Sequence, residues 1–78
     1  MSTVEMWARE GKTAGSTWTG ATVLHQQFRE WEDQAFPKNG TDLTAFGREM
    51  QRLIRSEQNF PWAVKKANVG MVYQRLIG

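Results

Sequence analysis

The chain has 78 residues, of which 40% are hydrophobic and 23% charged, and its net charge is +2. This length and mixture predict one small folded domain and exclude a disordered chain, which needs low hydrophobicity and a large net charge. With no cysteine and one histidine, His25, the sequence excludes a disulfide scaffold and a thiolate or histidine-rich metal site. No apolar run reaches the roughly 20 residues that span a bilayer, and no signal peptide is visible. We therefore expect a cytoplasmic domain that uses no membrane, metal or cofactor.

The first predicted element is a short helix over residues 3–10. Ser2 and Glu5 form the capping-box pattern that commonly begins a helix. Residues 11–20 are rich in glycine, serine and threonine. This composition predicts a loop, with one short extended stretch at residues 17–19.

An amphipathic helix that ends at Ala35 is predicted next. Apolar residues recur on one of its faces at positions i, i+4, i+7 and i+11: Leu24, Phe28, Trp31 and Ala35. Thr19 or Thr22 is expected to cap its start, and Pro37 disfavours helix at the residue before it. Three acidic residues of this helix are expected to face solvent: Glu30, Glu32 and Asp33.

A third helix is predicted over residues 41–55, after the turn Lys38-Asn39-Gly40 and with Thr41 as its cap. Its apolar side is expected to consist of Leu43, Phe46, Met50, Leu53 and Ile54. At roughly 100° per residue, a polar cluster lies almost opposite. The members of this cluster are Thr44, Arg48, Arg52 and Arg55, with Gln51 at its edge.

The end of the chain predicts a β-hairpin. Pro61 rules out a continuing helix, and two β-prone runs, residues 62–66 and 71–77, flank a turn that contains Asn68 and Gly70. Three helices followed by a C-terminal hairpin wing predict an α+β fold, a winged helix-turn-helix, over residues 1–78.

Basic residues gather in the second half of the chain. Residues 41–78 hold six basic and three acidic residues, whereas residues 1–40 hold four basic and five acidic residues. Three of the basic residues are the arginines on the outward face of the third helix. In a helix-turn-helix that face is placed to enter the major groove of DNA, where an arginine can grip a phosphate or a guanine edge. The predicted DNA-reading residues are Thr44, Arg48, Gln51, Arg52 and Arg55.

Three further basic residues are predicted near the tip of the hairpin: Lys65, Lys66 and Arg75. Such residues can contact the phosphates that flank the groove. They can equally serve to discourage edge-to-edge pairing between chains, and both interpretations stay open.

No pattern in the sequence supports catalysis. Gly11-Lys12-Thr13 resembles the end of a phosphate-binding loop, but Met6 stands where that motif requires its first glycine. His25 is expected to be a surface or boundary residue. Among the four tryptophans, Trp18 and Trp62 lie outside the predicted helices and are the candidates for a surface role.

A series of short, mostly apolar motifs extends from the second predicted helix to the end of the hairpin. Its members are Leu24, Phe28, Trp31, Asn39-Gly40, Leu43, Phe46-Gly47, Leu53, Tyr73 and Leu76. This series resembles the C-terminal winged-helix domain of phage and plasmid primase–helicases, which the poxvirus-type replicative helicases share. Phe28 stands where that family often has tyrosine, and His25 where it often has a first aromatic residue.

The resemblance implies DNA binding in the service of phage or plasmid replication, beside a primase–helicase. Because the catalytic modules of that family are absent from these residues, the chain is expected to be a fragment or a detached module of a longer protein. The expected function is thus non-catalytic DNA binding, with duplex favoured over single strands and residues 41–55 as the recognition helix. The alternative is a protein-interaction winged helix that docks onto a replication partner through Trp18 or Trp62.

Overall fold

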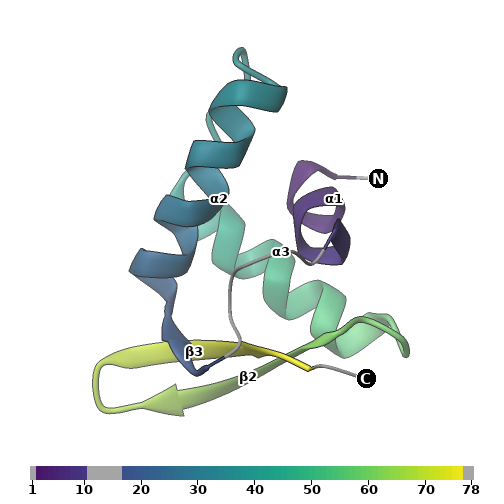
Figure 1. Ribbon diagram of the computed structural model, residues 1–78. Coiled ribbons are helices and arrows are strands. Elements are labelled where there is room, and N and C mark those ends of the chain that lie inside the picture. The colour runs from purple at the N-terminus through teal and green to yellow at the C-terminus, as the bar shows by residue number, and fades with distance from the viewer. Residues whose placement is uncertain (1, 11–16, 77–78) are drawn as a thin grey trace.

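The computed structural model describes residues 2–10 and 17–76 (Figure 1). Its elements in chain order are α1 (Thr3–Glu10), β1 (Thr19–Gly20), α2 (Ala21–Ala35), α3 (Leu43–Ser56), β2 (Trp62–Ala67) and β3 (Gly70–Arg75). The strands form one antiparallel sheet in the order β1-β3-β2, and the three helices lie on one side of it. The predicted α+β fold class is therefore confirmed, and the arrangement is compatible with a winged helix-turn-helix.

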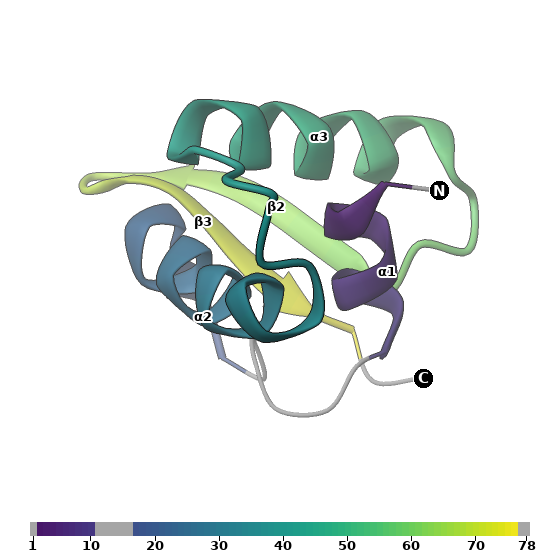
Figure 2. The same cartoon turned by 90° about the horizontal axis from the view of Figure 1, so that it is seen from above.

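The C-terminal hairpin has a defined register. Trp62 pairs with Arg75 at one end and Ala67 with Gly70 at the other, so that Asn68 and Val69 form the turn. Gly70 has a φ of 118°. Residues with a Cβ atom rarely adopt this backbone conformation, whereas glycine adopts it readily. The hairpin turn projects at the same end of the molecule as the starts of α2 and α3 (Figure 2).

The extended stretch predicted at residues 17–19 overlaps the two-residue strand β1 at Thr19 only, because β1 lies at Thr19–Gly20. Thr19 pairs with Tyr73 and Gly20 pairs with Val72, which makes β3 the central strand of the sheet. This pairing joins residues more than 50 positions apart along the chain. It ties the start of α2 to the wing.

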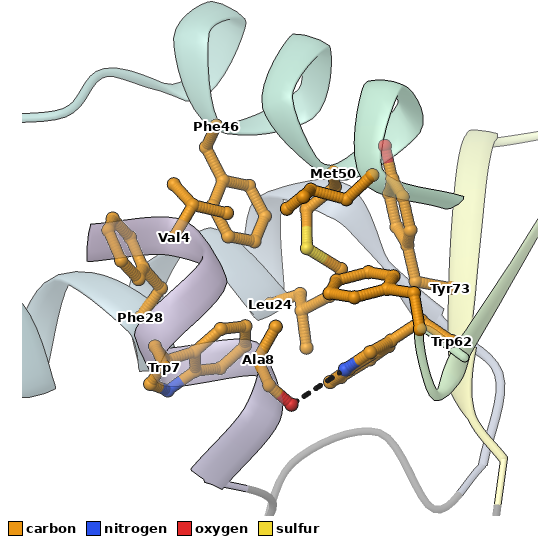
Figure 3. Close-up of a cluster of buried hydrophobic side chains, with 11 residues drawn as sticks. Val4, Trp7, Ala8, Leu24, Phe28, Phe46, Met50, Trp62 and Tyr73 are labelled. Carbon is orange, nitrogen blue, oxygen red and sulfur yellow. Dashed lines mark hydrogen bonds between the residues drawn. The ribbon is translucent and has the colours of Figure 1, made fainter. Parts of the chain in front are cut away.

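The hydrophobic core lies between the helices and the inner face of the hairpin (Figure 3). The Trp7 ring of α1 lies 5.6 Å from the ring of Phe28, 5.8 Å from that of Phe46 and 5.7 Å from that of Trp62. Trp7 thus contacts one aromatic residue from each of α2, α3 and β2. Because a large aromatic ring buries much apolar area, this cluster gives a short chain a substantial core.

Three predictions about helix starts have different outcomes. The Ser2 hydroxyl accepts a hydrogen bond of 3.1 Å from the Glu5 N–H, as the capping-box pattern predicts. The predicted threonine cap of α2 is wrong, because Gly20 occupies the N-cap position without a side-chain hydrogen bond. The predicted cap of α3 by Thr41 is also wrong: Asp42 is the N-cap, and its carboxylate accepts from the Ala45 N–H at 2.7 Å.

Glu32 is fully buried, so the expectation that it faces solvent is wrong. Its carboxylate accepts hydrogen bonds from the Thr3 hydroxyl at 3.0 Å and from the Thr41 hydroxyl at 2.7 Å. The Thr41 N–H at 3.2 Å and the Arg29 guanidinium at 2.7 Å complete its partners. One carboxylate therefore joins α1, α2 and the segment that leads into α3. These bonds also explain why the Thr41 hydroxyl does not cap α3.

The pKa of Glu32 lies below its ordinary value. Burial raises the pKa of this carboxyl, but the hydrogen bonds from Thr41, Thr3 and Arg29 together lower it by more. Because folding lowers the pKa, the unfolded chain takes up a proton more readily than the folded chain in acid.

We expect the stability that Glu32 contributes to be complete above the unfolded-state pKa of about 4.3. This stability is lost as the pH falls through the lower folded-state value. Urea unfolding between pH about 6 and about 3 measures it. The Glu32→Gln variant removes this titration while the other acids remain, so its stability should fall less steeply with acid. Parallel curves for the two proteins would contradict the expectation.

Candidate nucleic-acid interface

Helix α3 presents its polar face to solvent. Phe46, Met50 and Leu53 are fully buried on its other side. The predicted DNA-reading residues Thr44, Arg48, Arg52 and Arg55 are exposed, and Gln51 is half-buried. Leu43 differs from its prediction, because it is 40% exposed instead of part of the core.

An open groove of about 640 Å³ lies beside the first half of α3. We call it the wing groove, because the hairpin wing forms one of its sides. Its lining comes from three places: residues 20–23 at the start of α2; Leu43, Thr44, Gly47, Arg48 and Gln51 of α3; and residues 69–71 with Tyr73 of the wing. Three segments that are distant in sequence therefore form one concave surface.

The wing groove has a positive charge without a compensating acid. Among the described residues that line this groove, Arg48 is the one that carries a charge. None of the ion pairs found within residues 2–10 and 17–76 involves Arg48. An unpaired guanidinium beside the hydroxyl of Thr44 and the amide of Gln51 presents donors and acceptors suited to an anionic, hydrogen-bonding ligand.

The other two arginines of α3 lie outside the wing groove. Arg52 binds Glu49 through two hydrogen bonds, with Nε 2.7 Å from Oε1 and Nη2 2.8 Å from Oε2. The bonds from Arg52 hold the pKa of Glu49 below its ordinary value, although burial opposes them. Arg55 is exposed in the last turn of the helix. The structure thus brings Thr44, Arg48 and Gln51 together and separates the two later arginines from them.

Gln51 and Gly47 form the floor of the wing groove together with Tyr73. The Gln51 amide donates a hydrogen bond of 3.4 Å to the Tyr73 hydroxyl. A Cβ atom at Gly47 would lie 3.7 Å from that hydroxyl, at ordinary van der Waals distance. The floor therefore holds Gln51 against β3 through a buried tyrosine.

The two hairpin lysines lie on opposite faces of the wing. Both are exposed, and they pair with Val72 and Met71 close to the turn. Successive residues of a strand point to opposite faces. The Lys65 ammonium lies 4.3 Å from the centre of the Trp18 ring. Lys66 pairs with Met71, which lines the wing groove, so Lys66 is the lysine beside the groove.

Arg75 and Trp62 correct two expectations. Arg75 pairs with Trp62 at the end of the hairpin opposite the turn, so its predicted place near the tip is wrong. Its guanidinium lies 4.5 Å from the Trp62 ring and donates to the Ala8 carbonyl at 2.7 Å. Burial lowers the pKa of Arg75. The Trp62 indole N–H also donates to the Ala8 carbonyl (Figure 3), and this tryptophan is buried, so its suspected surface role is wrong.

Trp18 and His25 lie at the margins of the fold. Trp18 is 40% exposed, as its candidate surface role requires. His25 is half-buried, and its Nε2 atom lies 2.8 Å from the Thr41 carbonyl oxygen. His25 therefore joins α2 to the segment before α3, as expected of a boundary residue.

The periodicity of the sequence did not reveal the apolar side chains around the wing groove. Val23 is 50% exposed and Val69 is 87% exposed, and both line the groove together with Leu43. The sequence did place a hydrophobic residue in the first turn of each of two helices, Val23 and Leu43, and one at the hairpin tip, Val69. These positions were the available indication of an apolar surface. Helical spacing alone assigns Leu43 to the core.

Two further findings concern the described residues alone. Residues 2–10 and 17–76 contain no group of three or more histidine, cysteine, aspartate or glutamate side chains that could hold a metal ion. No helix in that part of the chain is long and apolar enough to cross a membrane. The Gly11-Lys12-Thr13 segment lies outside the described residues.

No family model, curated protein or solved structure matches the chain.

Proposed function

We propose that this chain is a non-catalytic DNA-binding winged-helix domain in which α3 is the recognition helix. The observation that supports the proposal best is Arg48, which has no ion-pair partner within the described part of the chain and lies in a groove where no described lining residue is acidic. Thr44 lies one helical turn before Arg48, and Gln51 nearly one turn after it. Each of these side chains has a hydrogen-bonding group that suits base edges or phosphates.

The shape of the surface supports duplex DNA as the partner. The major groove of B-DNA is about 12 Å wide and admits one α-helix. Helix α3 is exposed along its polar face, and Lys66 lies beside the wing groove, where it would contact a flanking phosphate. In this arrangement Thr44, Arg48 and Gln51 face the bases, while Arg55 and Lys65 supply a more distant positive charge.

The resemblance to the C-terminal domain of primase–helicases supports a place in phage or plasmid DNA replication. In that setting the domain would hold duplex DNA in the cytoplasm for a separate primase–helicase module. The proposal assigns no catalytic residue to the chain.

A protein-docking winged helix is the second candidate, and one observation favours it. Val23, Leu43 and Val69 leave apolar surface exposed around the wing groove. Buried apolar anchors usually dominate protein interfaces. Trp62 no longer serves this alternative, because its ring is buried in the core.

Fluorescence anisotropy of a labelled duplex of two to three helical turns, about 20–30 base pairs, tests the proposal. We expect binding that weakens as salt rises, with a log–log slope of about −3 to −5, because a handful of phosphate contacts release counterions. Absence of binding at low salt would reject DNA as the partner and favour the protein-docking alternative.

A further inference from the structure

The exposed apolar side chains of this protein are unevenly distributed. Among the described residues, five large hydrophobic side chains are exposed: Trp18, Val23, Leu43, Val69 and Leu76. Three of these five line the wing groove, which also contains the unpaired Arg48. Scattered single hydrophobic residues are ordinary on a protein surface, whereas a cluster in a concave site indicates a ligand with apolar groups.

Leu43 and Val23 lie where side chains could contact such a ligand. Leu43 is the first residue of α3 and Val23 lies in the first turn of α2. In a helix-turn-helix, the N-terminal residues of the recognition helix contact base edges. Leu43 would contribute more to the core if it were buried, yet 40% of it stays exposed beside Thr44.

Thymine is the base that offers an apolar group in the major groove. Its C5-methyl group projects there, and apolar side chains and the threonine methyl group contact it. Leu43 lies five residues before Arg48, which at 1.5 Å per residue is about 7.5 Å along the helix axis. The DNA axis rises about 3.4 Å per base pair, and a helix in the major groove crosses that axis at an angle, so this distance corresponds to at most about two base-pair steps.

We propose that Leu43, with Val23 and the methyl group of Thr44, forms a thymine-reading subsite within about two base pairs of the position that Arg48 contacts. The proposal rests on the DNA-binding function proposed above and defines its sequence preference. The ligand chemistry is a thymine methyl group adjacent to a hydrogen-bonding base edge or phosphate. Because Arg48 is a cation and no acidic residue is among the described residues that line the groove, charge complementarity favours an anionic DNA duplex over a neutral or basic protein surface as the occupant.

Uracil substitution tests this subsite, because uracil differs from thymine in DNA by the C5-methyl group alone. The probe is a duplex of about 20 base pairs, selected by the protein from a random pool, in which each thymine is replaced by uracil in turn. At one thymine or more, we expect replacement to weaken binding about fourfold, the value of one buried methyl group. The remaining thymines should be insensitive.

The Leu43→Ala variant distinguishes a methyl contact from an altered stiffness of the DNA. This variant should bind the duplex with thymine at the sensitive position and the duplex with uracil there equally well. Both proteins are tested on the same duplexes, which the wild-type protein selected. Leu76→Ala is the matched control, since Leu76 is also exposed but lies outside the groove. Its discrimination between thymine and uracil should equal that of the wild type.

Each other result overturns the subsite. Equal binding of all uracil duplexes, or a selection that enriches no sequence, would reject methyl reading while leaving DNA binding intact. A uracil effect that persists in Leu43→Ala would reject Leu43 as the residue that contacts the methyl group, and with it the subsite as proposed. Failure of the wild-type protein to retain any duplex at low salt would reject the DNA-binding function itself.

Discussion

Replacing Glu32 by alanine is expected to lower the free energy of unfolding by about 3–5 kcal/mol. The carboxylate is fully buried and is the shared acceptor of Thr3, Thr41 and Arg29. Its removal leaves the Thr41 N–H and the Arg29 guanidinium without this acceptor and opens a cavity at the junction of α1, α2 and α3. A folded chain of this size has a total free energy of unfolding of about 4–12 kcal/mol, so we expect the substitution to remove much of the stability.

Urea unfolding followed by tryptophan fluorescence measures the effect. Glu30→Ala is the matched control, because Glu30 lies on the same helix and is exposed. Its loss should stay within about 0.5 kcal/mol. Glu32→Gln should lie between the two, since an amide can still accept and donate among the same partners. A Glu32→Ala protein as stable as the Glu30→Ala protein would show that the hydrogen-bonded carboxylate contributes nothing to the fold.

Replacing Arg48 by alanine is expected to weaken DNA binding by about 1–3 kcal/mol, or roughly 5- to 150-fold. The reason is that Arg48 is the cation of the wing groove and has no ion-pair partner among the described residues. The side chain is exposed, so its removal should leave the fold stable. The anisotropy titration of a labelled duplex measures the loss.

Arg52→Ala is the control for this prediction. Arg52 lies on the same helix and is also exposed, but Glu49 already binds its guanidinium through two hydrogen bonds. We therefore expect a smaller loss of affinity for Arg52→Ala than for Arg48→Ala. A larger loss at Arg52 would show that DNA contacts α3 outside the wing groove, and equal affinity of all three proteins would contradict a recognition role for α3.

Local patterns in the sequence determined most of the secondary structure. The i, i+4, i+7 spacing of apolar residues predicted α2, and Pro37 predicted its end at Ala35. The turn with Asn68 and Gly70 predicted the hairpin. These patterns predict secondary structure because each depends on residues that are neighbours along the chain.

The sequence predicted the candidate site only in part. Helical periodicity placed Thr44, Arg48 and Gln51 on one exposed face. It could not show that Arg52 is bound by Glu49, because a helix projection gives the direction of a side chain and not its partner. Nor could it show that Leu43 lines a groove, because the groove exists only where α2 and the wing approach α3.

Contacts between distant parts of the chain were decided by the tertiary structure alone. Thr3 and Glu32 are 29 positions apart, and Ala8 and Trp62 are 54 positions apart, yet each pair is joined by a hydrogen bond. A carboxylate or an indole N–H can be buried at little cost only when it has hydrogen-bond partners. Here those partners are distant in sequence, so no local pattern predicts them. The sequence by itself therefore determined the elements and the basic face of α3. Only the packing of those elements decided which polar residues are structural and which remain free for a ligand.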